Sequence, residues 1–190
     1  MLMSYRKAER KDIDIMLEYW WGLHEYNVKF DKNYYAISSR EQALEIKKKY
    51  YEKIIDDDNF FIVIIENEEK KPVGFILGEI ISRDQFYIAN KYGLLREASV
   101  DPNYQQKGLF MKAYLGWSAF LKERGIDLIE SNIDLENKAV AAYWKLNYYK
   151  REFKLISWIK ETENFLRKLE KKKHIKKKRQ EKGVESEYII

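Results

Sequence analysis

Residues 97–110 place an acidic side chain, a proline and a glycine where a strand is predicted to turn into a helix; the segment reads EASVDPNYQQKGLF. Pro102 ends the strand, because proline cannot donate to a sheet ladder. The first turn of a helix has N–H groups without intrahelical partners and a partial positive charge, so a phosphate is stabilised there. Gly108 lets the backbone approach a ligand closely and Lys107 adds a cation. The segment therefore predicts a phosphate-binding loop, and an ordinary strand-to-helix turn is the alternative.

The same loop is neither a Walker A sequence nor a Rossmann fingerprint, because the required glycines and the Lys-Ser/Thr pair are absent. It resembles motif A of the GNAT N-acetyltransferases, and the matching residues are Val100, Pro102, Tyr104, Gln105 and Gly108. In that family the loop amides hold the pyrophosphate of coenzyme A, and the preceding strand pairs with the pantetheine arm and supplies an amide for the thioester oxygen.

This resemblance implies a set of cofactor-binding residues. The phosphate group would be bound by Gln105, Gln106, Lys107, Gly108, Leu109 and Phe110, and the pantetheine arm would be lined by Ala98, Ser99 and Val100. Phe110 departs from the usual glycine or alanine. Its amide is expected to bind, while its ring points to the side on which the helix packs.

A second resemblance to the GNAT family begins at Asn137, where the sequence reads NKAVAAYW and continues LNYY from Leu146. It implies that Asn137 contacts the cofactor arm, although a helix N-cap is an alternative role. A gapless overlay places Trp144 where many members have the tyrosine that protonates the departing thiolate. A shift of one residue gives that role to Tyr143, our candidate general acid, for which core packing is the alternative.

Acetyl transfer to an amine requires a free amine near the thioester, an oxyanion donor and a route for two protons. Glu97 is the candidate base, because related enzymes often use an acid three residues before the position of Val100, directly or through water. A solvated or ion-paired strand residue is the alternative. Positioning alone could supply much of the rate, since an unprotonated amine is already a competent nucleophile.

Hydrophobic patterning predicts the elements that must position these residues. Strands are expected at residues 5–8, 60–66, 73–81, 92–100, 127–134 and 149–160, and helices at residues 12–24, 39–54, 108–124 and 137–146. Ser39 is a predicted N-cap and Gly125 a predicted helix stop. The alternation of strands and helices indicates an α/β (α+β) fold. The GNAT resemblance implies a mixed, mainly antiparallel twisted sheet flanked by helices.

The acceptor site is indicated by aromatic residues alone, without a motif such as that of the cofactor loop. Aromatic residues gather in the first helix and the loop that follows it: Trp20, Trp21, Tyr26, Tyr34 and Tyr35. Tyr34 and Tyr35 are the candidate acceptor-binding residues, with core or loop packing as the alternative.

Composition narrows the function classes. The chain has 190 residues, 45% of them hydrophobic, which is enough for a sizeable core. It has no cysteine, and His24 and His174 have no metal-ligand spacing, so we expect no metal site. Charge precedes any apolar stretch at the N-terminus, and the longest apolar run, residues 60–65, is too short to span a bilayer. We therefore expect a cytoplasmic protein without a membrane span.

The basic character of the chain is concentrated near its end. Residues 167–182 carry a net charge of +8, so the rest of the chain carries −3 of the total of +5. We expect a GNAT-like domain at residues 1–161 and a basic C-terminal helical extension at residues 162–190. The extension could bind RNA, the ribosome or an anionic surface, and a solvated, frayed terminus is the alternative.

The leading functional hypothesis is an acyltransferase that uses acetyl-CoA as co-substrate and acetylates a primary amine of a small molecule or a protein. Two other hypotheses remain open: a non-catalytic GNAT-fold module that binds RNA or the ribosome through its basic tail, and a coenzyme A sensor. A homodimer is left open.

Overall fold

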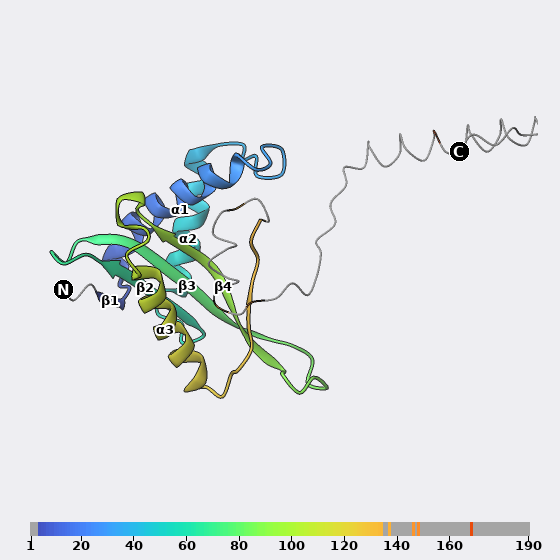
Figure 1. Cartoon of the computed structure of the whole chain (residues 1–190). Helices are drawn as coiled ribbons and strands as arrows, with labels where there is room; N and C mark the ends of the chain where they lie inside the picture. The colour runs from blue at the N-terminus through green and yellow to red at the C-terminus, as the bar shows by residue number, and fades with distance from the viewer. Residues whose placement is uncertain (1–3, 135–136, 138–145, 147, 149–167, 169–190) are drawn as a thin grey trace, which may run out of the picture. The chain divides into compact units, whose positions relative to one another are not determined.

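The computed structural model describes residues 4–134 together with residues 137, 146, 148 and 168 (Figure 1). The strands in this part of the chain are β1 (Ser4–Lys7), β2 (Phe60–Glu66), β3 (Pro72–Ser82), β4 (Lys91–Val100) and β5 (Ile129–Ser131). The helices are η1 (Arg10–Asp12), α1 (Ile13–Val28), α2 (Arg40–Ile54), η2 (Pro102–Tyr104) and α3 (Leu109–Lys122), of which η1 and η2 are single 3₁₀ turns. The chain divides into two compact units, Met1–Lys145 and Leu146–Ile190, and every element named above lies in the first.

The five strands form one mixed sheet in the order β1-β2-β3-β4-β5. Neighbours are antiparallel from β1 to β4, and β5 pairs with β4 in parallel. The predicted fold class is therefore confirmed. A strand parallel to its neighbour requires a crossover connection, and α3 lies between β4 and β5 in the chain.

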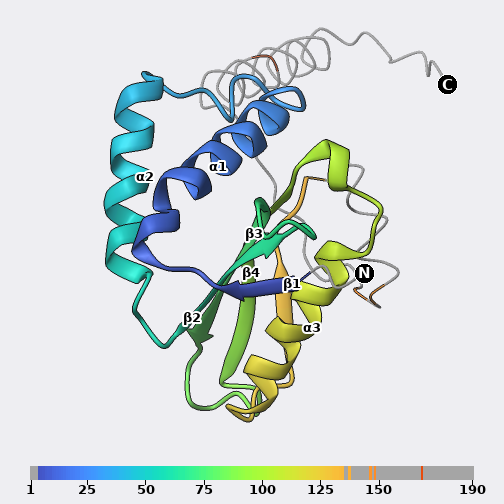
Figure 2. The ribbon, with the colours of Figure 1, turned by 90° about the vertical axis from the view of Figure 1, so that its left-hand side faces the viewer.

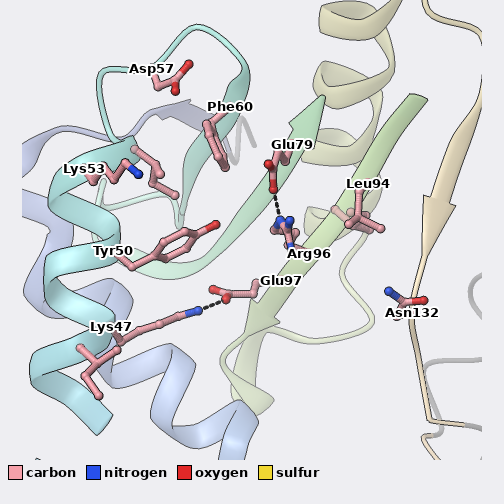
Figure 3. Close-up of a pocket in the computed structure, with 13 residues that line it drawn as sticks. Lys47, Tyr50, Lys53, Asp57, Phe60, Glu79, Leu94, Arg96, Glu97 and Asn132 are labelled. Atoms are coloured by element: carbon pink, nitrogen blue, oxygen red, sulfur yellow. Dashed lines mark hydrogen bonds and ion pairs between the residues drawn. The ribbon is translucent and has the colours of Figure 1, made fainter. Parts of the chain in front are cut away.

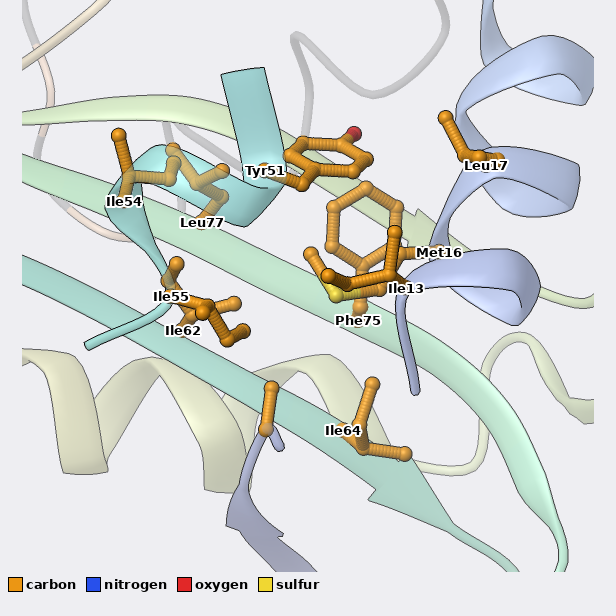
Figure 4. Close-up of a cluster of buried hydrophobic side chains, with 11 residues drawn as sticks. Ile13, Met16, Leu17, Tyr51, Ile54, Ile55, Ile62, Ile64, Phe75 and Leu77 are labelled. Carbon is orange, nitrogen blue, oxygen red and sulfur yellow. The ribbon is translucent and has the colours of Figure 1, made fainter. Parts of the chain in front are cut away.

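Helices cover both faces of the sheet: α1 and α2 lie on one side and α3 on the other (Figures 1 and 2). The first face holds a core cluster in which Met16, Tyr51, Ile64, Phe75 and Leu77 are completely or almost completely buried (Figure 4). The strand side chains alternate between the faces, so β2 and β3 contribute buried side chains to both layers.

On the opposite face, Trp117 of α3 is completely buried against the sheet. The close approach requires a glycine below the indole, since a Cβ atom on Gly78 would lie 2.9 Å from the Trp117 ring. A side chain at this position of β3 would push α3 away from the sheet, and with it the start of the helix.

The sequence located most of these elements. Ser39 caps α2 as predicted, because its side chain accepts a hydrogen bond from the Gln42 backbone N–H. Gly125 follows α3 with a positive φ of 67°. The predicted strand at residues 127–134 is shorter, since β5 pairs with β4 only as far as Ser131.

Other predictions fall on residues outside the described ones. They are the helix at residues 137–146, apart from residues 137 and 146, the strand at residues 149–160, and the basic extension at residues 162–190, apart from Lys168. The predicted domain boundary at residue 162 stays a prediction for the same reason. No helix among the described residues is long and apolar enough to cross a membrane.

Candidate functional site

Strand β4 changes its pairing at Arg96. The β3–β4 register shifts there, because Leu77 faces Glu97 and Gly78 faces Leu95, which leaves Arg96 as an extra residue in β4. Parallel pairing with β5 covers Gly93 to Leu95 and is not found beyond this point in the part of the chain that the structure describes. Such a bulge bends the strand and increases its twist. After Leu95, one edge of β4 is not paired with any residue that the structure describes, and we call it the open edge.

The open edge of β4 presents backbone groups of two residues. The Asp101 N–H donates to the Val73 carbonyl oxygen at 2.9 Å, so this amide points toward β3. Because successive amides alternate in direction, those of Ala98 and Val100 point away from β3. Gln105 Nε2 donates to the Val100 carbonyl oxygen at 2.9 Å. The N–H groups of Ala98 and Val100 could pair with an extended ligand.

A loop with two left-handed residues connects β4 to α3. Gln106 has φ 61° and Gly108, the N-cap of α3, has φ 75°. A Cβ atom on Gly108 would meet nothing within 4 Å, so the backbone is open on that side. Within the described residues, the N–H groups of Lys107, Gly108 and Leu109 make no backbone hydrogen bond. N–H groups that converge beside a helix start form an anion-binding concavity.

The loop side chains largely hold the loop itself. Asn67 Nδ2 donates to the Tyr104 hydroxyl oxygen at 3.2 Å, which ties the loop to the turn between β2 and β3. The ammonium of Lys107 lies 4.9 Å from the centre of the Tyr104 ring. Leu109 is buried, so its side chain packs and only its backbone can bind a ligand. The Phe110 ring packs 5.7 Å from that of Tyr114, on the next turn of α3.

A cavity of about 730 Å³ lies between α2 and the strands β3 and β4 (Figure 3). Its lining residues are Ile46, Lys47, Tyr50, Lys53, Ile54, Asp57, Phe60, Glu79, Leu94, Leu95, Arg96, Glu97 and Asn132. Glu97, the predicted base, is therefore a cavity residue on the same strand that carries the open edge.

The Glu97 carboxylate is held by two side chains of α2. One oxygen forms an ion pair with the ammonium of Lys47, and the other accepts a hydrogen bond from the Tyr51 hydroxyl at 2.6 Å. The Glu97 side chain is only 11% exposed and that of Lys47 17% exposed, so solvent screens this pair weakly. Burial, and then the charge of Glu97, raise the pKa of Tyr51 well above its ordinary value, so Tyr51 remains a donor.

A second ion pair, between Arg96 and Glu79, lies beside the first in the cavity (Figure 3). Burial raises the pKa of Tyr50 to about 12, so this residue is also protonated at neutral pH. The cavity thus combines the Glu97 carboxylate, the neutral phenol of Tyr50 and balanced ionic groups, while the buried Tyr51 holds Glu97 from outside the lining.

The remaining predicted site residues lie elsewhere. Tyr34 and Tyr35 pack against each other at 4.9 Å between α1 and α2 and do not line this cavity. The Asn137 N–H donates to the Asp134 carbonyl oxygen at 3.0 Å. Tyr143 and Trp144 lie outside the described residues, so the choice between them stays a prediction.

Sequence reasoning missed the residues that surround Glu97. Lys47 and Tyr51 precede it by 50 and 46 positions, and no spacing rule connects residues so far apart. One signal was present: Tyr51 lies on the apolar face of α2, and a buried tyrosine usually needs a partner for its hydroxyl.

The profile of the Acetyltransferase (GNAT) family matches residues 18–148. The match includes the open edge of β4, the loop at Gly108 and the cavity. The chain belongs to the GNAT acetyltransferase family.

Solved structures support the GNAT fold. A tetramutant of a Bacillus halodurans protein is 14% identical with a TM-score of 0.73, covering 83% of this chain and 100% of the other. Glucosamine-6-phosphate N-acetyltransferase from Arabidopsis thaliana is 19% identical with a TM-score of 0.61, covering 84% and 99%. A predicted acetyltransferase with acetyl-CoA from Clostridium acetobutylicum is 16% identical with a TM-score of 0.63, covering 84% and 98%. No curated protein matches the sequence.

These likenesses concern the fold alone and assign no substrate to this GNAT protein. Among the residues that the structure describes, no group of three or more His, Cys, Asp or Glu side chains could hold a metal ion.

Proposed function

We propose that this protein is an acetyl-CoA-dependent N-acetyltransferase that acts on a primary amine of a small molecule or a protein. Membership of the GNAT family supports acetyl transfer. The observation that carries the proposal is the open edge of β4, which runs from the cavity at Glu97 to the left-handed turn at Gly108.

The residues along this edge fit coenzyme A. The Ala98 and Val100 amides suit the amide groups of a pantetheine arm, as the edge of a sheet pairs with an extended chain. The N–H groups at the start of α3 suit a diphosphate, with Lys107 nearby as a cation. When bound, the coenzyme supplies a thioester whose acetyl group is transferred.

Glu97 would remove a proton from the acceptor ammonium, directly or through a water molecule. The amine nitrogen then forms a bond with the acetyl carbon, the carbon–sulfur bond breaks, and the leaving thiolate takes up a proton. An ammonium and a thioester thus give an amide, a thiol and one released proton. Tyr143 is the proposed donor to the thiolate.

Calorimetric titration with acetyl-CoA, followed by detection of free thiol across a panel of primary amines, tests the proposal. Gly108→Glu should weaken acetyl-CoA binding about 30-fold or more, because it places a carboxylate among the phosphate-binding amides. Gly125→Glu is the matched control: it has a similar positive φ of 67° and equal open space, but lies at the other end of α3.

Failure of acetyl-CoA to bind the wild-type protein at millimolar concentration would overturn the proposal. Equal acetyl-CoA affinities of Gly108→Glu and Gly125→Glu would show that the loop at Gly108 does not bind acetyl-CoA. Binding without transfer to any amine would leave a coenzyme A-binding protein that is not an enzyme.

A further inference from the structure

The ammonium of Lys47 lies in a cage of three aromatic rings and one carboxylate. Its nitrogen is 5.2 Å from the centre of the Trp20 ring, 4.9 Å from that of Tyr50 and 5.2 Å from that of Tyr51. Glu97 completes this ammonium cage with an ion pair. The ammonium of a lysine or of a ligand is attracted to the face of an aromatic ring when it lies within about 6 Å of the ring centre.

The ammonium cage is assembled from three elements and opens into the cavity. Trp20 comes from α1, Tyr50 and Tyr51 from α2, and Glu97 from β4. Figure 3 shows Lys47 extending from α2 across the cavity to Glu97. The Lys47 side chain therefore occupies the position where an ammonium contacts Glu97 best.

This arrangement restricts what an acceptor can be. A base must contact the group that it deprotonates, so an acceptor amine that uses Glu97 needs the position held by Lys47. The charged residues of the cavity wall are Lys47, Lys53, Arg96, Asp57, Glu79 and Glu97, three of each sign. If the Lys47 ammonium moves away, the cavity keeps one uncompensated negative charge, which favours a cationic occupant.

We propose that the Lys47 ammonium stands in for that of the acceptor, and that the acceptor is a primary alkylammonium on an unbranched methylene arm that displaces Lys47 from the cage. The arm of Lys47 itself defines the shape of such a group. This inference rests on the proposed function, since it identifies the substrate class of the same site.

Steady-state kinetics with n-butylamine test the inference. Lys47→Met keeps the stem and removes the competing ammonium, so KM for n-butylamine should fall about ten-fold. Lys53→Met removes an equal charge from the wall of the same cavity and should change KM by less than about two-fold, because Lys53 lines the cavity without being one of the residues that form the cage. An unchanged or raised KM in Lys47→Met would overturn the inference.

A second measurement needs no coenzyme. In Lys47→Met, n-butylammonium chloride should raise the melting temperature more than it does in the wild type, whereas n-butanol, which has the same shape without charge, should have little effect. The double variant Lys47→Met/Glu97→Gln should lose the response. Lys47→Gln, which keeps a donor for Glu97, replaces Lys47→Met if that variant does not fold.

The two measurements separate the hypotheses. If acetyl-CoA binding and turnover are absent but the expected thermal shifts occur, the proposed function is contradicted and the ammonium cage is supported. If amines are turned over but n-butylammonium gives equal thermal shifts in all variants, the proposed function is supported and the ammonium cage is contradicted.

Discussion

The loop before α3 and the cavity around Glu97 differ in the atoms that form them. The loop uses backbone N–H groups of consecutive residues, placed by two positive φ angles. The cavity uses side chains, with Glu97 held by Lys47 and Tyr51 from a helix about 50 positions earlier. A backbone site tolerates changes of side chain that keep its dihedral angles, whereas a side-chain site depends on each partner. The predictions for four variants that follow test this difference, from the largest expected effect to the smallest.

Arg6→Met tests whether both regions depend on the same fold. Arg6 binds Asp12 with two hydrogen bonds of 2.6 and 2.8 Å and Glu66 with one of 2.7 Å. Both carboxylate side chains are at least nine-tenths buried. When Asp12 and Glu66 lose the Arg6 guanidinium, the free energy of unfolding should fall by about 3 kcal/mol, because two buried carboxylates lose their cationic partner. Chemical denaturation measures this, and binding by the protein that remains folded should be unchanged in both regions.

The same variant predicts a pH dependence. The hydrogen bonds from Arg6 hold the pKa of Asp12 below its ordinary value of 3.8, although burial opposes them. The folded state therefore favours the ionised carboxyl group, and this stabilisation is present above pH 3.8 and is lost as the pH falls through the lower folded pKa. The free energies of unfolding of the wild type and Arg6→Met should converge in acid, and a constant difference would contradict the assignment.

Glu97→Gln tests the side-chain site. The amide cannot accept a proton from the acceptor, so kcat/KM should fall about 100-fold, while acetyl-CoA affinity should change little. Glu79→Gln changes the carboxylate that pairs with Arg96 in the same cavity and should have a much smaller effect. Comparable losses in the two variants would mean that Glu97 contributes only charge.

Tyr51→Phe removes the 2.6 Å hydrogen bond to Glu97 and keeps the ring. We expect kcat to fall about ten-fold and the free energy of unfolding by about 1 kcal/mol. Steady-state kinetics and chemical denaturation measure the two effects. A loss of stability without a loss of rate would indicate that the Tyr51 hydroxyl has a packing role alone.

Lys107→Ala tests the backbone site by removing a side chain. If the N–H groups supply most of the binding, acetyl-CoA affinity should fall only about two- to three-fold, and the difference should shrink at high salt. A loss as large as that expected for Gly108→Glu would show that the Lys107 charge, not the backbone, dominates the loop.

The sequence was informative wherever a property belongs to neighbouring residues. The hairpin at Phe60–Glu66 and Pro72–Ser82, the cap at Ser39 and the glycine stop at Gly125 all follow from local rules that the structure confirms. The bulge at Arg96 was not predicted, and among the described residues the pairing of β5 with β4 ends at Leu95, immediately before it. A register shift arises between two strands, so neither strand shows it by itself.

The sequence by itself determined the order of elements in the described part of the chain, the family and the loop at Gly108, because helix starts, turns and positive φ angles depend on contiguous residues. Only the tertiary structure decided which side chains meet Glu97, and that Lys47 rather than solvent faces it. Contacts between α2 and β4 depend on how the helix packs on the sheet, and that packing is decided by the shapes of many side chains together.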